Sequence, residues 1–110
     1  MTEIILQYFD GCPNWETTAR YVATLIDGGL DATIDYEVID SYEKAVQRRF
    51  PGSPTVLING VDPFAKPNAE PGLACRIYDT ETGPAGSPTI GQLRKAIART
   101  QKGRTRGDGH

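Results

Sequence analysis

Histidine and cysteine are scarce in this sequence. Among 110 residues there are two cysteines and one histidine, and that histidine is His110 at the C-terminus. These residues cannot supply the four ligands of a structural zinc site within one chain. A Cys–His catalytic pair is equally disfavoured, because the histidine lies in a glycine-rich tail. We therefore expect no metal site and no cofactor.

Long apolar runs and an excess of charge of one sign are also lacking. No apolar run approaches the roughly 18 residues that a membrane-spanning helix needs, so we expect no membrane partner. Lysine and arginine number 12 against 14 aspartate and glutamate residues, for a net charge of -2, which argues against a nucleic-acid binder built on a basic face. The N-terminal MTEIILQYFD has no basic segment ahead of its apolar run, which predicts no secretory signal and a cytoplasmic protein.

The chain has the length and composition of one small domain. Its 38% of hydrophobic residues can bury one modest core. Residues 101–110 are rich in glycine and arginine, so we expect residues 1–100 to form the domain and 101–110 to be a disordered tail. Segment 61–73 contains three prolines and segment 80–87 has no apolar period, so both are expected as loops.

Apolar spacing and turn residues predict an alternation of strands and helices. The nearly continuous first apolar run is typical of a strand covered on both faces. Asp40 with Glu43, and Thr89 with Gln92, are candidate capping boxes at two helix starts. The predicted fold is an α/β three-layer sandwich with a central mixed four-stranded sheet, in which the first two strands are parallel and the fourth is antiparallel. The expected order, β-α-β-α-β-β-α, has strands at 4–9, 33–39, 54–58 and 74–78 and helices at 13–27, 42–50 and 89–100.

The sequence Gly11-Cys12-Pro13-Asn14-Trp15 places a cysteine between the end of a strand and the start of a helix. Unpaired N–H groups and the positive end of the helix dipole favour a thiolate in that position. The alternative is a buried, inert cysteine. Asp10 is either a proton donor, if it is buried, or an ordinary turn residue at the surface. Trp15 either contacts substrate or heads the buried stripe of the helix.

A second feature is Gly52-Ser53-Pro54-Thr55, directly before an apolar strand. A proline at this position removes a backbone donor and is a candidate for a cis peptide bond. An ordinary proline at a strand entry is the simpler interpretation.

Together the two features resemble the thioredoxin superfamily, in which a strand–Cys-Pro-x-x–helix turn faces a later x-Pro-Thr loop. The resemblance implies that Cys12 is the nucleophile, that Pro54 is a cis-proline, and that the partner is a thiol or disulfide substrate. It departs from the family at Trp15, where a second cysteine is usual, so the chemistry expected of Cys12 alone is monothiol exchange. The residues that would then bind substrate are Pro13, Trp15, Ser53, Pro54 and Thr55.

Cys75 is the one candidate partner for Cys12 in the sequence. If the last two strands form a plain hairpin, Cys75 lies about 14 Å from the first turn, too far for a disulfide. The long segment 61–73 could instead fold back and bring Cys75 to Cys12. Both arrangements are compatible with the sequence, and a buried structural thiol at Cys75 is the alternative to a catalytic one.

A narrower resemblance covers residues 11–15, 52–55, 60–64 and 72–76. These segments look like those of small actinobacterial-type thioredoxin family proteins, which are sometimes labelled alkylmercury lyase-like. That likeness implies that Cys12 and Cys75 bind mercury or another soft metal and that Asp10 protonates the leaving carbon. The sequence thus leaves three functions open: thiol–disulfide exchange, organomercurial cleavage or soft-metal capture, and a non-catalytic interaction module.

Overall fold

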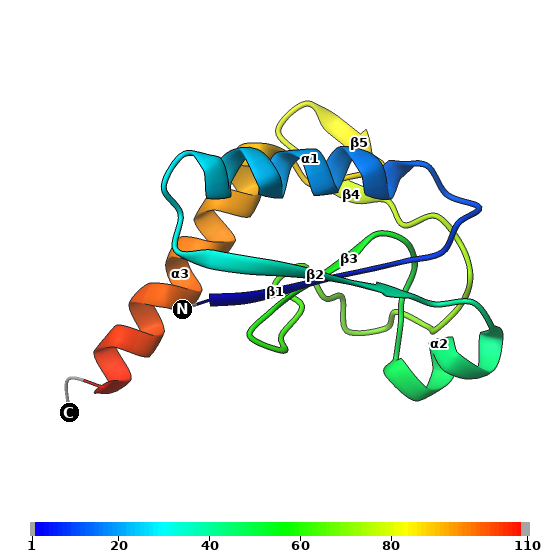
Figure 1. The fold of residues 1–110 in the computed structure, drawn as a ribbon. Helices are drawn as coiled ribbons and strands as arrows, with labels where there is room; N and C mark the ends of the chain where they lie inside the picture. Colours follow the sequence, from blue (N-terminus) through cyan, green and yellow to red (C-terminus); the bar gives the residue numbers. More distant parts are fainter. Residues whose placement is uncertain (1, 109–110) are drawn as a thin grey trace.

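A three-stranded mixed sheet lies at the centre of the computed structural model, which describes residues 2–108. Strand β1 (Thr2–Tyr8) lies between β2 (Ala32–Val38) and β3 (Thr55–Ile58). β1 is parallel to β2 and antiparallel to β3, and helix α1 (Asn14–Asp27) connects the two parallel strands (Figure 1). The parallel pairing of the first two strands confirms the prediction.

The expected fourth strand of this sheet is wrong. Strand β4 (Tyr78–Thr80) pairs with β5 (Gly83–Ala85), and the two form a separate antiparallel hairpin. The predicted strand 74–78 would require a buried face, but Ile77 and the preceding Leu73 are 57% and 40% exposed. This segment instead makes one parallel bridge, between Cys75 and the residue two positions ahead of β3. The α/β class holds, whereas the central sheet has three strands within the part of the chain that the structure describes.

Helices α1 and α3 (Ile90–Asp108) lie on the same face of the sheet (Figure 1). The predicted capping box at the start of α3 is confirmed, because Thr89 N–H donates to Gln92 Oε1 at 2.9 Å and Gln92 N–H donates to Thr89 Oγ1 at 3.1 Å. The helix runs past the boundary predicted at residue 100, so residues 101–108 of the expected tail continue it.

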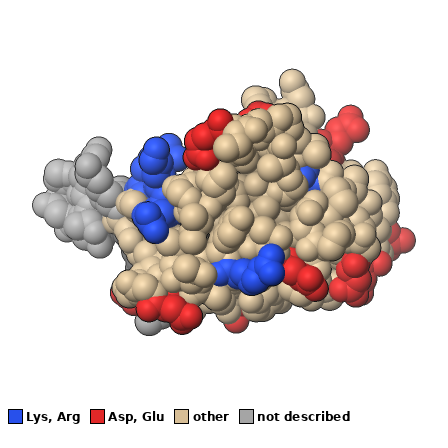
Figure 2. All heavy atoms as spheres, turned by 90° about the horizontal axis from the view of Figure 1, so that it is seen from above, with Lys and Arg blue, Asp and Glu red and all other residues tan. Residues whose placement is uncertain are grey.

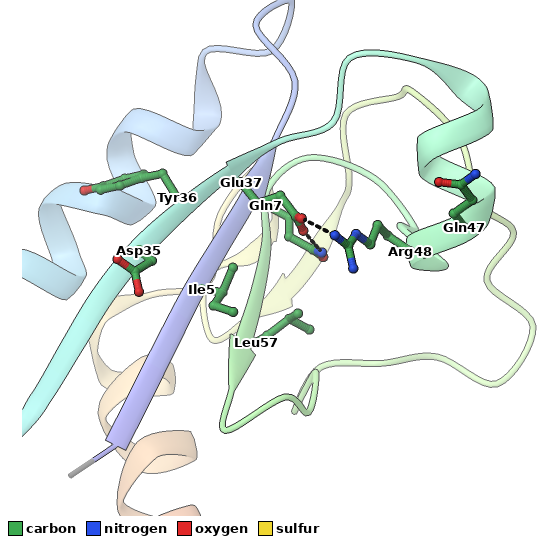
Figure 3. Close-up of a pocket in the computed structure, with 8 residues that line it drawn as sticks. All are labelled: Ile5, Gln7, Asp35, Tyr36, Glu37, Gln47, Arg48 and Leu57. Carbon is green, nitrogen blue, oxygen red and sulfur yellow. Dashed lines mark hydrogen bonds and ion pairs between the residues drawn. The ribbon is translucent and has the colours of Figure 1, made fainter.

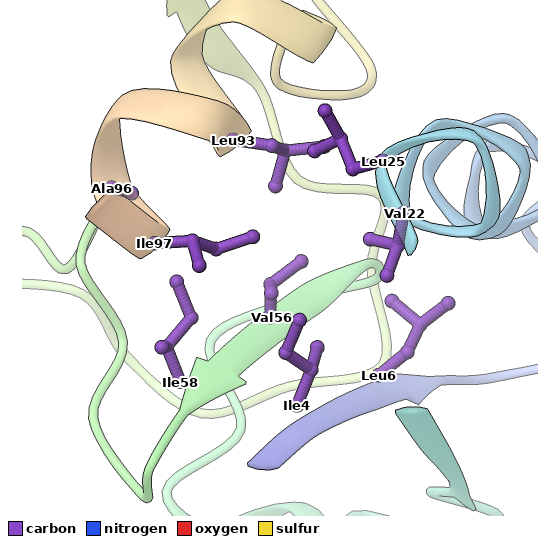
Figure 4. Packing of buried hydrophobic residues seen from close by; sticks show 9 residues of the cluster. All are labelled: Ile4, Leu6, Val22, Leu25, Val56, Ile58, Leu93, Ala96 and Ile97. Carbon is purple, nitrogen blue, oxygen red and sulfur yellow. The ribbon is translucent and has the colours of Figure 1, made fainter. Parts of the chain in front are cut away.

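The main core fills the space between the sheet and these two helices (Figure 4). Strand residues alternate between the two faces of a sheet, so alternate residues of β1 and β3 point toward the helices. Full burial of each such side chain contributes about 1.5–3 kcal/mol. The cluster consists of Ile4, Leu6, Val22, Leu25, Val56, Ile58, Leu93, Ala96 and Ile97.

The opposite face of the sheet is only partly covered, so the expected third layer is incomplete. Helix α2 (Tyr42–Arg48) lies near one end of that face, beyond the end of β2 (Figure 1). Its N-cap is Ser41, whose Oγ accepts the Lys44 N–H at 3.1 Å, and not the predicted Asp40–Glu43 pair. Between α2 and the sheet lies an open hollow of about 570 Å³ (Figure 3).

Candidate functional site

Cys12 lies on the turn between β1 and α1. Its N–H donates to the Phe9 carbonyl oxygen at 3.2 Å, and Pro13 follows as the N-cap of α1 with φ -74° and ψ -10°. The thiol donates to the carbonyl oxygen of Ser53 over 3.6 Å. Cys12 is therefore at the helix N-terminus, as predicted, but it is 0% exposed. A partner molecule cannot reach this sulfur directly.

The Ser53–Pro54 peptide bond, which faces Cys12, is cis, as the thioredoxin resemblance implies. Ser53, Pro54 and Thr55 are all buried. The Thr55 hydroxyl donates to the Gly52 carbonyl oxygen at 2.7 Å. These side chains are thus enclosed by the protein, and their substrate-binding role stays a prediction.

Both backbone polar groups of Ser53 bind the segment that carries Cys75. Ser53 N–H donates to the Ala74 carbonyl oxygen at 2.8 Å, and Arg76 N–H donates to the Ser53 carbonyl oxygen at 2.9 Å. Gly52 has φ +135°, and a Cβ there would lie 3.0 Å from the Ala74 oxygen. A glycine is needed at Gly52 because only it allows both this backbone angle and this close approach.

These backbone bonds bring the two cysteines together. The pKa of the Cys75 thiol is raised, first by a hydrogen bond with the Cys12 side chain and then by partial desolvation and by the charge of Cys12. The Cys12 thiol bonds to the Ser53 carbonyl oxygen, and Cys75 forms a parallel bridge with the same residue, so the two cysteines are neighbours in the structure. Both are free. Segment 61–73 folds back, and the far-end placement of Cys75 that a plain hairpin would give is not found. Unlike Cys12, Cys75 is exposed.

Arg76, next to Cys75, anchors this segment in the protein. Its guanidinium donates to Asp62 Oδ2 at 2.8 Å and to the Phe64 carbonyl oxygen at 2.6 Å, and it reaches the Thr55 hydroxyl at 3.2 Å. The side chains of Arg76 and Asp62 are only 9% and 13% exposed. Sequence reasoning missed this anchor. The available signal was Asp62, one of two acidic residues in the predicted loop 61–73, and the basic residue directly after Cys75.

Tyr78 completes the anchor on the other side of Arg76. The Arg76 guanidinium lies 4.5 Å from the centre of the Tyr78 ring, and the Tyr78 hydroxyl donates to the Pro54 carbonyl oxygen. Burial raises the pKa of Tyr78, and the nearby Arg76 charge opposes that rise in part. The neutral phenol is therefore the form that holds the Pro54 loop.

The remaining predicted site residues lie around the turn. Trp15 is half-buried, stacks on Tyr8 with 4.2 Å between ring centres and packs against the main core, which supports its interpretation as a core residue. Pro13 is exposed. Asp10 is also exposed, and its carboxylate makes no hydrogen bond or ion pair with the described residues. Asp10 therefore matches the surface-turn interpretation better than that of a buried proton donor.

The hollow below the sheet is a weaker candidate site (Figure 3). Three of its polar side chains already pair with one another: Gln7 donates to Glu37 at 2.8 Å, and Arg48 lies 3.1 Å from the same carboxylate. Side chains that already bond to one another offer few hydrogen-bonding groups to a ligand. The cysteine pair remains the better candidate because its chemistry is distinctive.

Neither the charges on the face of Figure 2 nor any cluster of metal-ligating side chains marks a further site among the described residues. On the face shown in Figure 2, basic and acidic side chains lie in small separate groups around a large uncharged area. No group of three or more His, Cys, Asp or Glu side chains among the described residues could hold a metal ion. None of the described helices combines the length and the apolar character that crossing a membrane requires.

Comparison with known proteins finds no family model, no curated protein and no solved structure that matches this chain. The resemblance to thioredoxin proteins thus depends on the residues of this chain alone.

Proposed function

We propose that the protein is a thioredoxin-like thiol–disulfide oxidoreductase whose redox pair is Cys12 and Cys75. The observation that carries the proposal is that the only two cysteines in the sequence both adjoin Ser53: the Cys12 thiol bonds to its carbonyl oxygen, and Cys75 bridges it. Backbone bonds to Ser53 hold the Cys75 segment there. Sequence reasoning on Cys12 favoured monothiol exchange, whereas the neighbouring Cys75 supplies the second thiol that a dithiol cycle needs.

The arrangement of strands and helices around Cys12 and Pro54 supports the proposal. A parallel β1–α1–β2 unit carries Cys12 at the start of α1, and a cis-proline precedes the antiparallel β3. This arrangement is similar to the thioredoxin pattern. The second thiol comes from Cys75 instead of from the position held by Trp15.

The reaction balances without a cofactor. One thiolate attacks a partner disulfide, RSSR, and forms a mixed disulfide while one RS⁻ leaves. The other thiolate of the pair then attacks the protein sulfur of the mixed disulfide, and the second RS⁻ leaves. The protein loses two electrons and two protons and gains the Cys12–Cys75 disulfide. A low-molecular-weight thiol reverses the cycle.

The test is the reduction of a small disulfide, bis(hydroxyethyl) disulfide, with dithiothreitol as the electron source. We expect the wild type to accelerate the reaction and to form the Cys12–Cys75 disulfide, seen as the loss of two hydrogens in the intact mass. Cys12→Ala and Cys75→Ser should each lose the disulfide and most of the acceleration. A wild type that never forms this disulfide, or that accelerates no more than the double variant, would contradict the proposal and favour a non-catalytic interaction module.

The neighbouring positions of the two cysteines also favour a second candidate, the capture of a soft metal ion. Two thiolates suit a two-coordinate ion such as Cu(I). Cleavage of an organomercurial needs a proton donor in addition, and the exposed, unpaired Asp10 carboxylate gives that activity little support. Incubation with an alkylmercury compound separates these outcomes, because binding without release of the hydrocarbon indicates capture alone.

A further inference from the structure

The two sulfurs of the pair differ in their access to solvent. Cys12 is 0% exposed, and its thiol bonds to the carbonyl oxygen of Ser53, the residue that Cys75 bridges. Cys75 is exposed. Because a thiolate must reach the sulfur that it attacks, access decides which sulfur exchanges with a partner.

We infer that partners exchange at the sulfur of Cys75 and that Cys12 is the internal thiol, the reverse of the order that the thioredoxin resemblance implies. This inference rests on the proposed function and adds the site of the mixed disulfide. The surroundings of Cys75 agree with it. Leu73 and Ile77, two positions away on either side, are exposed, so neither end of the segment blocks an approach. Arg76 points the other way, into the protein.

Exchange at Cys75 starts from the oxidised protein. A partner thiolate, RS⁻, attacks the Cys75 sulfur of the oxidised protein, so that the R–S–S–Cys75 bond forms and the Cys12–Cys75 bond breaks. The electron pair of the broken bond goes to the Cys12 sulfur, which takes up a proton and becomes the thiol that donates to the Ser53 carbonyl oxygen in the reduced protein.

A second partner thiolate then attacks the partner sulfur of the mixed disulfide. RSSR leaves, and the Cys75 thiolate takes a proton from water. The partner has lost two electrons and the protein has gained them. The reverse reaction passes through the same mixed disulfide, so Cys75 is the exchanging sulfur in both directions.

The experiment adds reduced glutathione to the oxidised wild type, quenches with acid and maps the glutathione by peptide mass. We expect glutathione on Cys75. In parallel, reduced Cys12→Ala and Cys75→Ser are incubated with oxidised glutathione. Cys12→Ala should form the mixed disulfide about tenfold faster or more, because its remaining thiol is exposed. In urea the two variants should react at similar rates, which controls for intrinsic thiol reactivity.

The outcomes separate the two proposals. Glutathione on Cys12 in the wild type, or Cys75→Ser reacting as fast as Cys12→Ala in the folded state, overturns the inference while the redox pair survives. A wild type that never forms the Cys12–Cys75 disulfide overturns the proposed function, and this inference with it. Mapping in the wild type keeps the test valid even if a variant folds poorly.

Discussion

The two cysteine-bearing segments are held in place by different kinds of contact. The Cys12 turn is local: its amide bonds to Phe9, and α1 begins two residues later. The Cys75 segment depends on residues far away in the sequence, the backbone of Ser53 and the carboxylate of Asp62. The local segment carries the buried sulfur, and the long-range segment carries the exposed one.

This difference means that the proposed redox pair, Cys12 and Cys75, can be separated by substitutions on the Cys75 side only. Substitutions around Cys75 should release its segment and leave the Cys12 turn and the main core intact. We expect the largest effect from loss of the Arg76–Asp62 ion pair and the smallest from a change in the pKa of the Cys75 thiol.

The largest effect is expected at Arg76. Arg76→Ala leaves the mostly buried Asp62 carboxylate without its ion-pair partner, so the free energy of unfolding should fall by up to about 3–5 kcal/mol. The control is Lys66→Ala, which removes an exposed ion pair with Asp79 and should change stability by less than about 1 kcal/mol. Urea unfolding measures both. Equal losses in the two variants would show that the anchor contributes no more than a surface pair.

Gly52→Ala should have the next largest effect. The positive φ of Gly52 disfavours alanine, and the added Cβ would press on the Ala74 oxygen. Gly60→Ala is the matched control, since Gly60 also has a positive φ but nothing within 4 Å. We expect about 1–2 kcal/mol of destabilisation for Gly60→Ala and about 1–3 kcal/mol more for Gly52→Ala. Only Gly52→Ala should slow formation of the Cys12–Cys75 disulfide, which mass spectrometry can follow.

Tyr78 should make stability depend on pH in the alkaline range. Its pKa is raised by burial, so the folded state keeps a proton that the unfolded state loses above about pH 10. The free energy of unfolding should then fall by up to about 1.4 kcal/mol per pH unit from this group. Tyr78→Phe should remove that part of the slope between pH 9 and 11, as measured by urea unfolding. Parallel slopes for the two proteins would argue against the role of the buried phenol.

The smallest expected effect is on the titration of Cys75. Its pKa is raised chiefly by Cys12, so the rate of its alkylation by iodoacetamide should rise at lower pH in Cys12→Ala than in the wild type. The readout is peptide mapping of alkylated Cys75 across a pH series. In urea, where the two cysteines are no longer neighbours, the two profiles should coincide. Coincidence in the folded state as well would mean that the thiols do not interact.

The sequence predicts those parts of the fold and of this site that short-range contacts determine. The Thr89–Gln92 box and the β1–α1–β2 unit follow from short-range patterns, and the structure confirms them. At α2 the predicted Asp40 cap is one residue away from the actual cap, Ser41, because adjacent residues of this kind compete for the same N–H groups.

The long-range half of the site could not be predicted in the same way. The alternation of Leu73, Cys75 and Ile77 resembles a strand face, but those side chains are exposed, because the backbone of the segment bonds to Ser53 ahead of β3 and does not extend a ladder. The course of segment 61–73 depends on the pairing of Arg76 with Asp62. A salt bridge between distant residues leaves no local period in a sequence.

The N–H and carbonyl groups of Ser53 are already bonded within the protein, which affects any peptide that would pair with them. An extended peptide that paired with Ser53 would have to displace Ala74 and Arg76, which are tethered to the same chain and so present at an effective concentration of about millimolar. Peptides that bind weakly should therefore not displace these two residues from Ser53. Selectivity should therefore depend on how far a thiol projects from its own molecule and on the apolar contacts beside it, and not on the partner's main chain.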